Sequence, residues 1–191
     1  MALLIFGLIL FLGMHSLRIV ADGGRTAFIE RFGELSYKGA YSVLSLIGIV
    51  LVSMGYNRAY GEYGVLYEPV AGLSHLALIL VPIAFVLVTA AYLPAGHIKQ
   101  AVKHPMVLGV ALWALGHLLA NGMVADVVLF GAFLVWALAD YASSLSRPLA
   151  LSARGAVSVK GDLAALAIGL VMAGLFIAFL HRYLFGVSPV G

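Results

Sequence analysis

The stretch PMVLGVALWALGHLLANGMVADVVLFGAFLVWALADYA, residues 105–142, decides the fold. It contains two apolar runs, 105–121 and 124–142, which meet at Asn121-Gly122-Met123. A bilayer core of roughly 30 Å needs about 20 mostly apolar residues per helix. Each run is therefore expected to cross a membrane as a helix, and so short a connection predicts a tight hairpin turn between the two helices.

The composition of the whole chain also indicates a membrane protein. Of its 191 residues, 63% are hydrophobic and 10% are charged, and the mean hydropathy is +1.09. Soluble domains carry about 25% charged residues, so this chain lacks the polar side chains that a water-facing surface needs. The net charge is +3 and the basic residues are scattered, which excludes a nucleic-acid-binding surface. The absence of cysteine excludes disulfides, thiolate metal sites and a cysteine nucleophile.

The same length criterion, applied along the chain, predicts an all-α polytopic membrane helix bundle with six transmembrane helices in a single domain, 1–191. The expected spans are approximately 2–20, 39–56, 72–93, 105–121, 124–142 and 162–184. The first span lacks a basic leading region and a clear cleavage site, so we expect it to be retained as a helix.

The distribution of lysine and arginine predicts the orientation, because short cytoplasmic loops retain positive charge. One side receives nine basic residues: Arg18, Arg25, Arg31, Lys38, Lys99, Lys103, Arg147, Arg154 and Lys160. The other side receives only Arg58 and Arg182. The first, third and fifth connections are therefore expected in the cytoplasm, and both termini in the periplasm of a bacterial inner membrane.

The connections and the last span have features of their own. Tyr56, Tyr60, Tyr63 and Tyr67 recur at helical spacing, which predicts a surface-lying helical segment. TAFIERFGELSYK, residues 26–38, is expected to be a short interfacial helix or a solvated loop, and 143–160 a flexible linker. Ala165, Gly169 and Ala173 form a small-residue stripe, which predicts close helix packing either inside the bundle or between protomers of a homo-oligomer.

Ionisable residues inside a membrane span are costly, and so are candidates for function. His15 and His117 lie deepest in their predicted spans, while His104 and His75 open two other spans. The last two histidines, His97 and His181, stand near basic residues and are expected at the membrane interface.

The neighbours of the two deepest histidines favour a flat ligand. Gly7, Phe11, His15 and Arg18 share one helix face, and Trp113, His117 and Asn121 share another. Gly7 would leave room for a ring system, Phe11 and Trp113 would wall it, and Arg18 would pair with a propionate. Two histidines from different helices can hold the iron of haem b axially. Proton relay or transport by the same histidines stays open at this point.

Three segments resemble one family of bacterial membrane proteins. LFLGMHSLRI (10–19), AAYLP (90–94) and KHPMVLGVALWALGHLLANG (103–122), together with the apolar fifth span, resemble the NnrU family over nearly all of the first 142 residues. The resemblance implies a small polytopic protein associated with nitric oxide and denitrification metabolism. The 15-cis-zeta-carotene isomerases are more distantly similar. They use haem b held by histidines in segments that match His15 and His117, and they have a cysteine where this chain has Ala114.

Two functions therefore follow from the sequence. The first is a haem b (iron) membrane protein with His15 and His117 as metal ligands and with Arg18, Phe11, Trp113 and Asn121 around the cofactor. It would act as a polyene isomerase on a hydrophobic small molecule or as a factor in nitric oxide metabolism. His104 and His75 are the runner-up ligands. The alternative is a non-enzymatic membrane protein or small transporter that uses its histidines as a proton relay.

Overall fold

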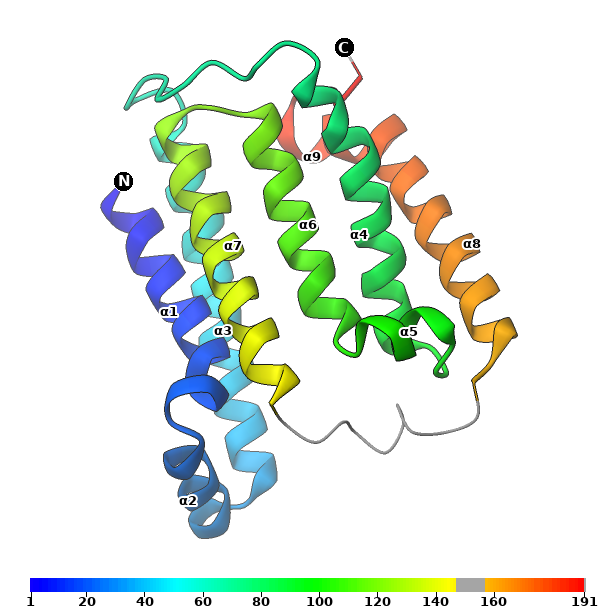
Figure 1. Cartoon of the computed structure of the whole chain (residues 1–191). Helices are drawn as coiled ribbons and strands as arrows, with labels where there is room; N and C mark the ends of the chain where they lie inside the picture. The colour runs from blue at the N-terminus through cyan, green and yellow to red at the C-terminus, as the bar shows by residue number, and fades with distance from the viewer. Residues whose placement is uncertain (147–156, 191) are drawn as a thin grey trace. The chain divides into compact units, whose positions relative to one another are not determined.

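The computed structural model describes residues 1–146 and 157–190, and within them it is helical throughout, apart from turns and one isolated antiparallel bridge between Val65 and Met123 (Figure 1). The predicted all-α fold is therefore confirmed. The helices are α1 (Ala2–Val20), α2 (Asp22–Phe32), α3 (Glu34–Ala59), α4 (Ala77–Tyr92), α5 (His97–Val102), α6 (Pro105–Ala120), α7 (Val124–Leu145), α8 (Val159–Leu175) and α9 (His181–Phe185). A short 3₁₀ helix, Leu73–Leu76, precedes α4, and a π-helical segment, Phe176–Leu180, joins α8 to α9.

Five helical segments of the described chain are long and apolar enough to cross a membrane. They are Ala2–Val20, Glu34–Ala59, Leu73–Tyr92, Val124–Leu145 and Val159–Phe185. The predicted fourth span corresponds to α6, which has 16 residues. At a rise of about 1.5 Å per residue, such a helix extends only about 24 Å, and so α6 is shorter than the thickness of a typical bilayer core.

The predicted tyrosine helix is wrong. Tyr56 belongs to α3, but Tyr60 ends that helix, and the chain up to the 3₁₀ helix is irregular. Gly61 and Gly64 take φ values of +80° and +72°, which belong to the left-handed region that glycine tolerates and a right-handed helix excludes.

The other connections differ in detail from the prediction. In the first connection the helical alternative holds, although α2 ends at Phe32 and Gly33, with φ +86°, separates it from α3. Most of the predicted linker 143–160 falls on residues 147–156, outside the described part of the chain.

The chain forms two compact units, and the boundary between them falls inside α7, after Trp136. The first unit contains residues 1–68 and 122–136. The second contains 69–121 and the described residues that follow 136.

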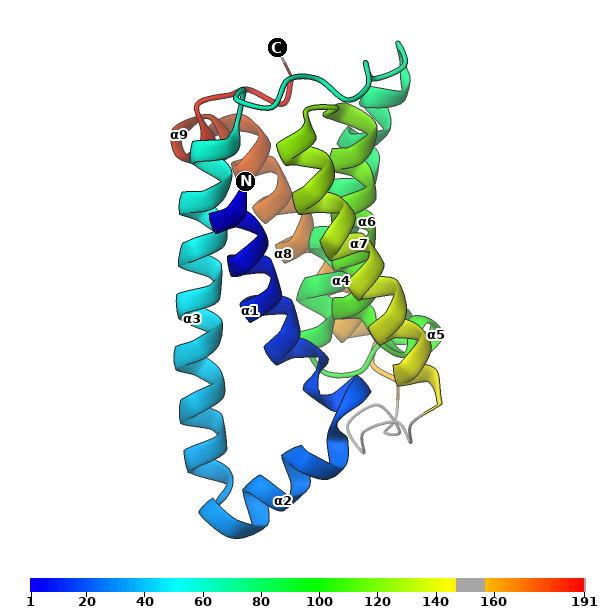
Figure 2. The same cartoon turned by 90° about the vertical axis from the view of Figure 1, so that its left-hand side faces the viewer.

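In the first unit, α1 and α3 pack backbone to backbone (Figure 2). A Cβ atom on Gly7 would lie 2.5 Å from the backbone nitrogen of Val52, and one on Gly48 would lie 2.9 Å from that of Phe11. A Cβ atom on Gly55 would overlap the backbone of Leu4. The space at Gly7 is thus filled by α3, and the expectation that it leaves room for a cofactor ring is wrong.

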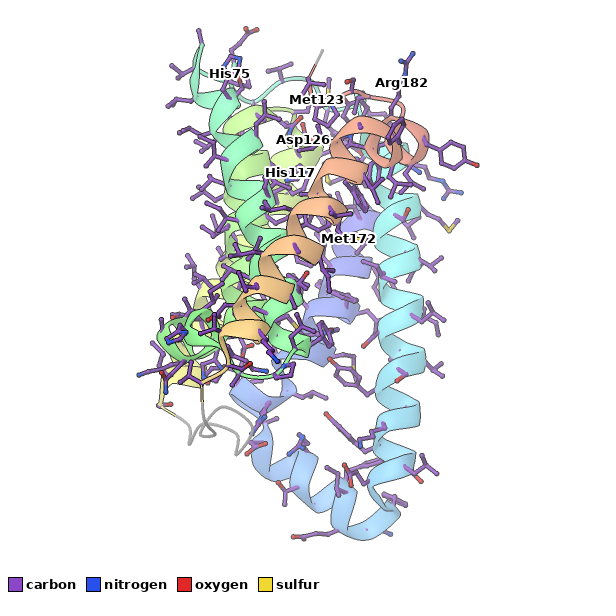
Figure 3. The ribbon with its side chains drawn as sticks, turned by 90° about the vertical axis from the view of Figure 1, so that its right-hand side faces the viewer. His75, His117, Met123, Asp126, Met172 and Arg182 are labelled. Carbon is purple, nitrogen blue, oxygen red and sulfur yellow. The ribbon has the colours of Figure 1, made fainter. Side chains whose placement is uncertain are left out.

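A buried carboxylate, Asp126, joins α3 to α7 in the same unit (Figure 3). Its side chain is 2% exposed and accepts hydrogen bonds from the Tyr56 hydroxyl at 2.5 Å and from the Met123 backbone N–H at 3.2 Å. The second bond is one half of a capping box, in which the third helical residue satisfies the N–H of the capping residue. Asp126 therefore stabilises the start of α7.

The loop after α3 covers this junction. The backbone N–H groups of Leu66 and Tyr67 both donate to the Gly122 carbonyl, and Val124 donates to the Gly64 carbonyl. Burial, and then the negative charge of Asp126, raise the pKa of the Tyr67 hydroxyl. The loop thus closes over the turn that connects α6 to α7.

In the second unit, α4 packs against both α6 and α8. A Cβ atom on Gly109 would lie 3.0 Å from the Ala84 carbonyl oxygen, and one on Gly169 would lie 2.6 Å from the Cα atom of Val86. Ala165 and Ala173 are buried on either side of Gly169. The small-residue stripe is therefore used for packing within the chain, which is the first of the two roles that the sequence left open.

We expect Gly55→Ala to destabilise the protein, because the added Cβ forces the backbones of α1 and α3 apart. Overpacking of this kind costs about 1–3 kcal/mol. Gly39→Ala, on the same helix, is the control, because a Cβ there meets nothing within 4 Å and alanine gains up to about 1 kcal/mol of helix propensity. Thermal unfolding in detergent, followed by circular dichroism, measures both. Equal midpoints for the two variants would contradict the packing analysis.

Tyr56→Phe is expected to lower stability by about 1.5–3 kcal/mol, since it removes a hydrogen bond to a buried charged group. Tyr60→Phe is the matched control, because Tyr60 is 49% exposed. The same unfolding measurement applies, and a midpoint for Tyr56→Phe as high as that of Tyr60→Phe would show that the Asp126 junction contributes little.

Candidate functional site

His15 lies in the first unit, and its ring orientation is set by its own helix. Its Nδ1 lies 2.7 Å from the Phe11 carbonyl oxygen, one turn earlier. A carbonyl oxygen only accepts hydrogen bonds, so Nδ1 carries a proton and donates it, and in the neutral ring Nε2 then carries the lone pair. The backbone of α1 thus prepares His15 to act as a ligand through Nε2, as metal-binding histidines do.

Aromatic rings surround His15. Its ring centroid lies 4.3 Å from that of Phe11, 5.1 Å from that of Tyr41 and 5.9 Å from that of Trp136, the last with the two planes at 89°. Arg18, in the last turn of α1, is exposed. The structure thus brings Phe11 and His15 together as predicted, whereas Tyr41 and Trp136 are neighbours that the sequence pattern did not identify.

His117 lies in the second unit and repeats the arrangement of His15. Its Nδ1 donates to the Trp113 carbonyl at 2.8 Å, and the two ring centroids are 5.2 Å apart. The His117 carbonyl in turn accepts hydrogen bonds of 2.9 Å from the side chain and the backbone of Asn121. The predicted face of Trp113, His117 and Asn121 is therefore a continuous hydrogen-bonded run at the end of α6, with Asn121 as its cap.

His181 is the neighbour of His117 that the sequence analysis missed. The two ring centroids lie 6.5 Å apart with their planes at 19°, and the Nδ1 of His181 lies 2.8 Å from the Val187 carbonyl oxygen. His181 begins α9, directly after the π-helical segment. Segments of this kind are rare and occur frequently at functional sites. The available signal was that the predicted fourth and sixth spans both end on the same side, with a histidine near each end.

The spacing of His117 and His181 suits one atom between them. A direct hydrogen bond of about 3 Å between two ring nitrogens would bring the centroids to about 5 Å. Two metal–nitrogen bonds of about 2 Å, plus roughly 1 Å from each nitrogen to its ring centre, separate imidazoles on opposite sides of a metal ion by about 6 Å. The observed 6.5 Å is closer to the second value.

The runner-up ligands lie elsewhere. His75 is exposed in the 3₁₀ helix before α4 (Figure 3). His104 precedes α6, its ring lies edge-on to Tyr141, and its buried Nε2 has no hydrogen-bond partner within the described residues. Lys103 before it has φ +60°, and the His104 N–H donates to the Val102 carbonyl at 2.6 Å. This is a strained γ-turn.

Other metal chemistry finds little support in the described residues. They contain no group of three or more His, Asp or Glu side chains that could hold a metal ion. His97, expected at the interface, is exposed and pairs with Asp162 at 2.8 Å, where it ties α5 to the start of α8. A site of two imidazoles is thus the arrangement that the histidines present.

The comparisons with known proteins extend the resemblance seen in the sequence. The family model described as NnrU protein matches residues 3–189, nearly the whole chain. The searches of curated proteins and of solved structures gave no match. The family match includes both histidine clusters and every helix described above, and so the chain belongs to the NnrU family.

Proposed function

We propose that the protein is an integral membrane haem b protein in which His117 is one axial ligand and His181 the other. The observation that carries the proposal is the pair of nearly parallel imidazoles with centroids 6.5 Å apart. Each ring donates its Nδ1 proton to a backbone carbonyl, which leaves Nε2 as the ligand nitrogen. His15, the second ligand predicted from the sequence, has the same local arrangement and is the alternative to His181.

The surrounding residues would position the ligands and limit access. Asn121 caps α6 at the His117 carbonyl, and Trp113 places an indole beside the His117 ring, which restricts its rotation. Arg18 as the partner of a propionate stays a prediction from the sequence. Haem, when bound, supplies an iron centre that transfers single electrons or binds diatomic molecules such as nitric oxide. That chemistry agrees with the role in nitric oxide and denitrification metabolism that the family resemblance implies.

Polyene isomerisation is the other reaction that the resemblance implies. The related isomerases carry a cysteine at the position of Ala114, and Ala114 is completely buried. A protein without that thiol would keep its histidine ligands and lack a thiolate as a replacement ligand. Binding of a diatomic molecule or electron transfer is therefore the activity that we propose.

Protein purified from haem-supplemented cells is expected to show a Soret band and sharp reduced α and β bands, with near one haem per chain by pyridine haemochrome assay. His117→Ala and His181→Ala are each expected to lose most of the haem or to convert it to a five-coordinate spectrum, because an axial ligand is removed. His75→Ala is the matched control, since His75 is exposed. His15→Ala tests the pairing predicted from the sequence.

Each outcome of the spectra decides between alternatives. Loss of haem in His15→Ala, with retention in His181→Ala, would replace His181 by His15 as the second ligand. Colourless wild-type protein, or full haem content in all three variants, would contradict haem binding. A proton relay through the histidines would then be the better account of the same residues.

The proposal also includes the orientation in a bacterial inner membrane with both termini outside. Because the chain has no cysteine, single cysteines can be introduced without removing any native one. Glu62→Cys, in the loop after α3, is expected to react with a membrane-impermeant maleimide on intact spheroplasts, and Gly23→Cys, in α2, only after lysis. Both positions are exposed. The reverse labelling pattern would invert the orientation that the basic residues predict.

A further inference from the structure

A cavity of about 310 Å³ lies among α1, α2 and α3 of the first unit. Its wall includes Met14 and Leu17 of α1, Gly24 and Phe28 of α2, and Tyr41 and Leu44 of α3. Among the described residues that line it, Arg25 alone is charged, and it lies over the ring of Tyr37 at 5.4 Å. The volume is at the lower end of the range for small-molecule sites, and the lining is as apolar as such sites require.

The cavity follows from the way in which α1 and α3 meet. The two helices touch through Gly55, Gly7 and Gly48, and they diverge toward α2, which bridges their far ends (Figure 2). The wedge between them begins beyond the contact of Gly48 with Phe11. It opens where α2 carries its charged residues, and so the closed end of the wedge is the end nearest His15.

The closed end carries polar atoms without partners. Tyr41, Ser45 and Gly48 follow one another on the face of α3 that meets α1. Tyr41 both lines the cavity and contacts the His15 ring. The hydroxyl of Ser45 and the indole N–H of Trp136, whose ring is edge-on to His15, are buried and have no hydrogen-bond partner within the described residues.

Unpartnered donors at membrane depth point to a missing acceptor, because no water in the bilayer core would satisfy them. An indole N–H only donates, so its partner must be an acceptor atom such as an oxygen. The apolar wall requires that the rest of the partner be lipophilic. A phospholipid that entered from the α2 end would bring its terminal methyl groups to Ser45 and Trp136, which offers these donors nothing.

We infer that the wedge binds a lipophilic carbonyl compound of the quinone type. Its ring lies beside His15, with an oxygen accepting from Trp136 and Ser45, and its apolar chain extends along Leu17 and Phe28 toward α2. This inference does not rest on haem binding, since it uses only residues of the first unit.

The test uses the full chain in nanodiscs of phosphatidylcholine, with 2-decyl-1,4-benzoquinone as the probe and decylbenzene as a comparator that has the same chain and no oxygen. Calorimetric titration is expected to show saturable binding of the quinone. Loss of one hydrogen bond in Trp136→Phe or Ser45→Ala should weaken it about fivefold. Gly24→Leu fills the cavity and should weaken binding about tenfold or more.

Gly23→Leu is the matched control. Gly23 and Gly24 are adjacent in α2, and a Cβ on either meets nothing within 4 Å, but only Gly24 lines the cavity. Unchanged affinity in Gly24→Leu, or equal binding of decylbenzene, would overturn the inference. Displacement of the probe by added phosphatidylglycerol would overturn it in favour of a lipid. The same titration on His117→Ala protein separates this result from that of the haem proposal, and binding there is expected to be unchanged.

Discussion

The close approach of α1 and α3 is the constraint on which the first unit depends. Lipid chains are as apolar as leucine, so helices in a bilayer associate through van der Waals packing, and small residues allow that packing to be tight. Gly7, Gly48 and Gly55 let the two backbones touch along half of their length. The contact brings Tyr41 to the His15 ring. Where the glycines end, the helices separate, and the wedge with its apolar lining begins.

A second device is local and occurs twice. His15 and His117 each donate Nδ1–H to the carbonyl four residues earlier, which only a helix places within reach. The bond removes the choice of tautomer and presents Nε2 to the surroundings. A histidine inside an apolar helix thereby becomes a directed ligand without any help from another segment. What it then binds depends on the side chains that other helices bring beside it.

The irregular parts of the backbone occur near polar groups in the second unit. A π-helical segment precedes His181, and a γ-turn at Lys103 precedes His104. Each departs from regular geometry at a cost that the local sequence does not offset, and such costs are commonly found where a side chain must be aimed. Helical periodicity assumes 3.6 residues per turn, and so it could not place His181 beside His117 across five π-helical residues.

The sequence by itself determined the all-α membrane architecture, the positions of the helices to within a few residues, the family, and the contacts of Phe11 with His15 and of Trp113 with His117. These properties follow from hydrophobic length and from neighbours one turn apart, which are local. Tertiary structure alone decided that Gly7 is filled by α3, that Asp126 caps α7 against Tyr56, and that His181 accompanies His117. Each of these depends on residues distant in sequence, and the physical reason is that packing between helices, unlike the periodicity within one, is not written in the spacing of residues.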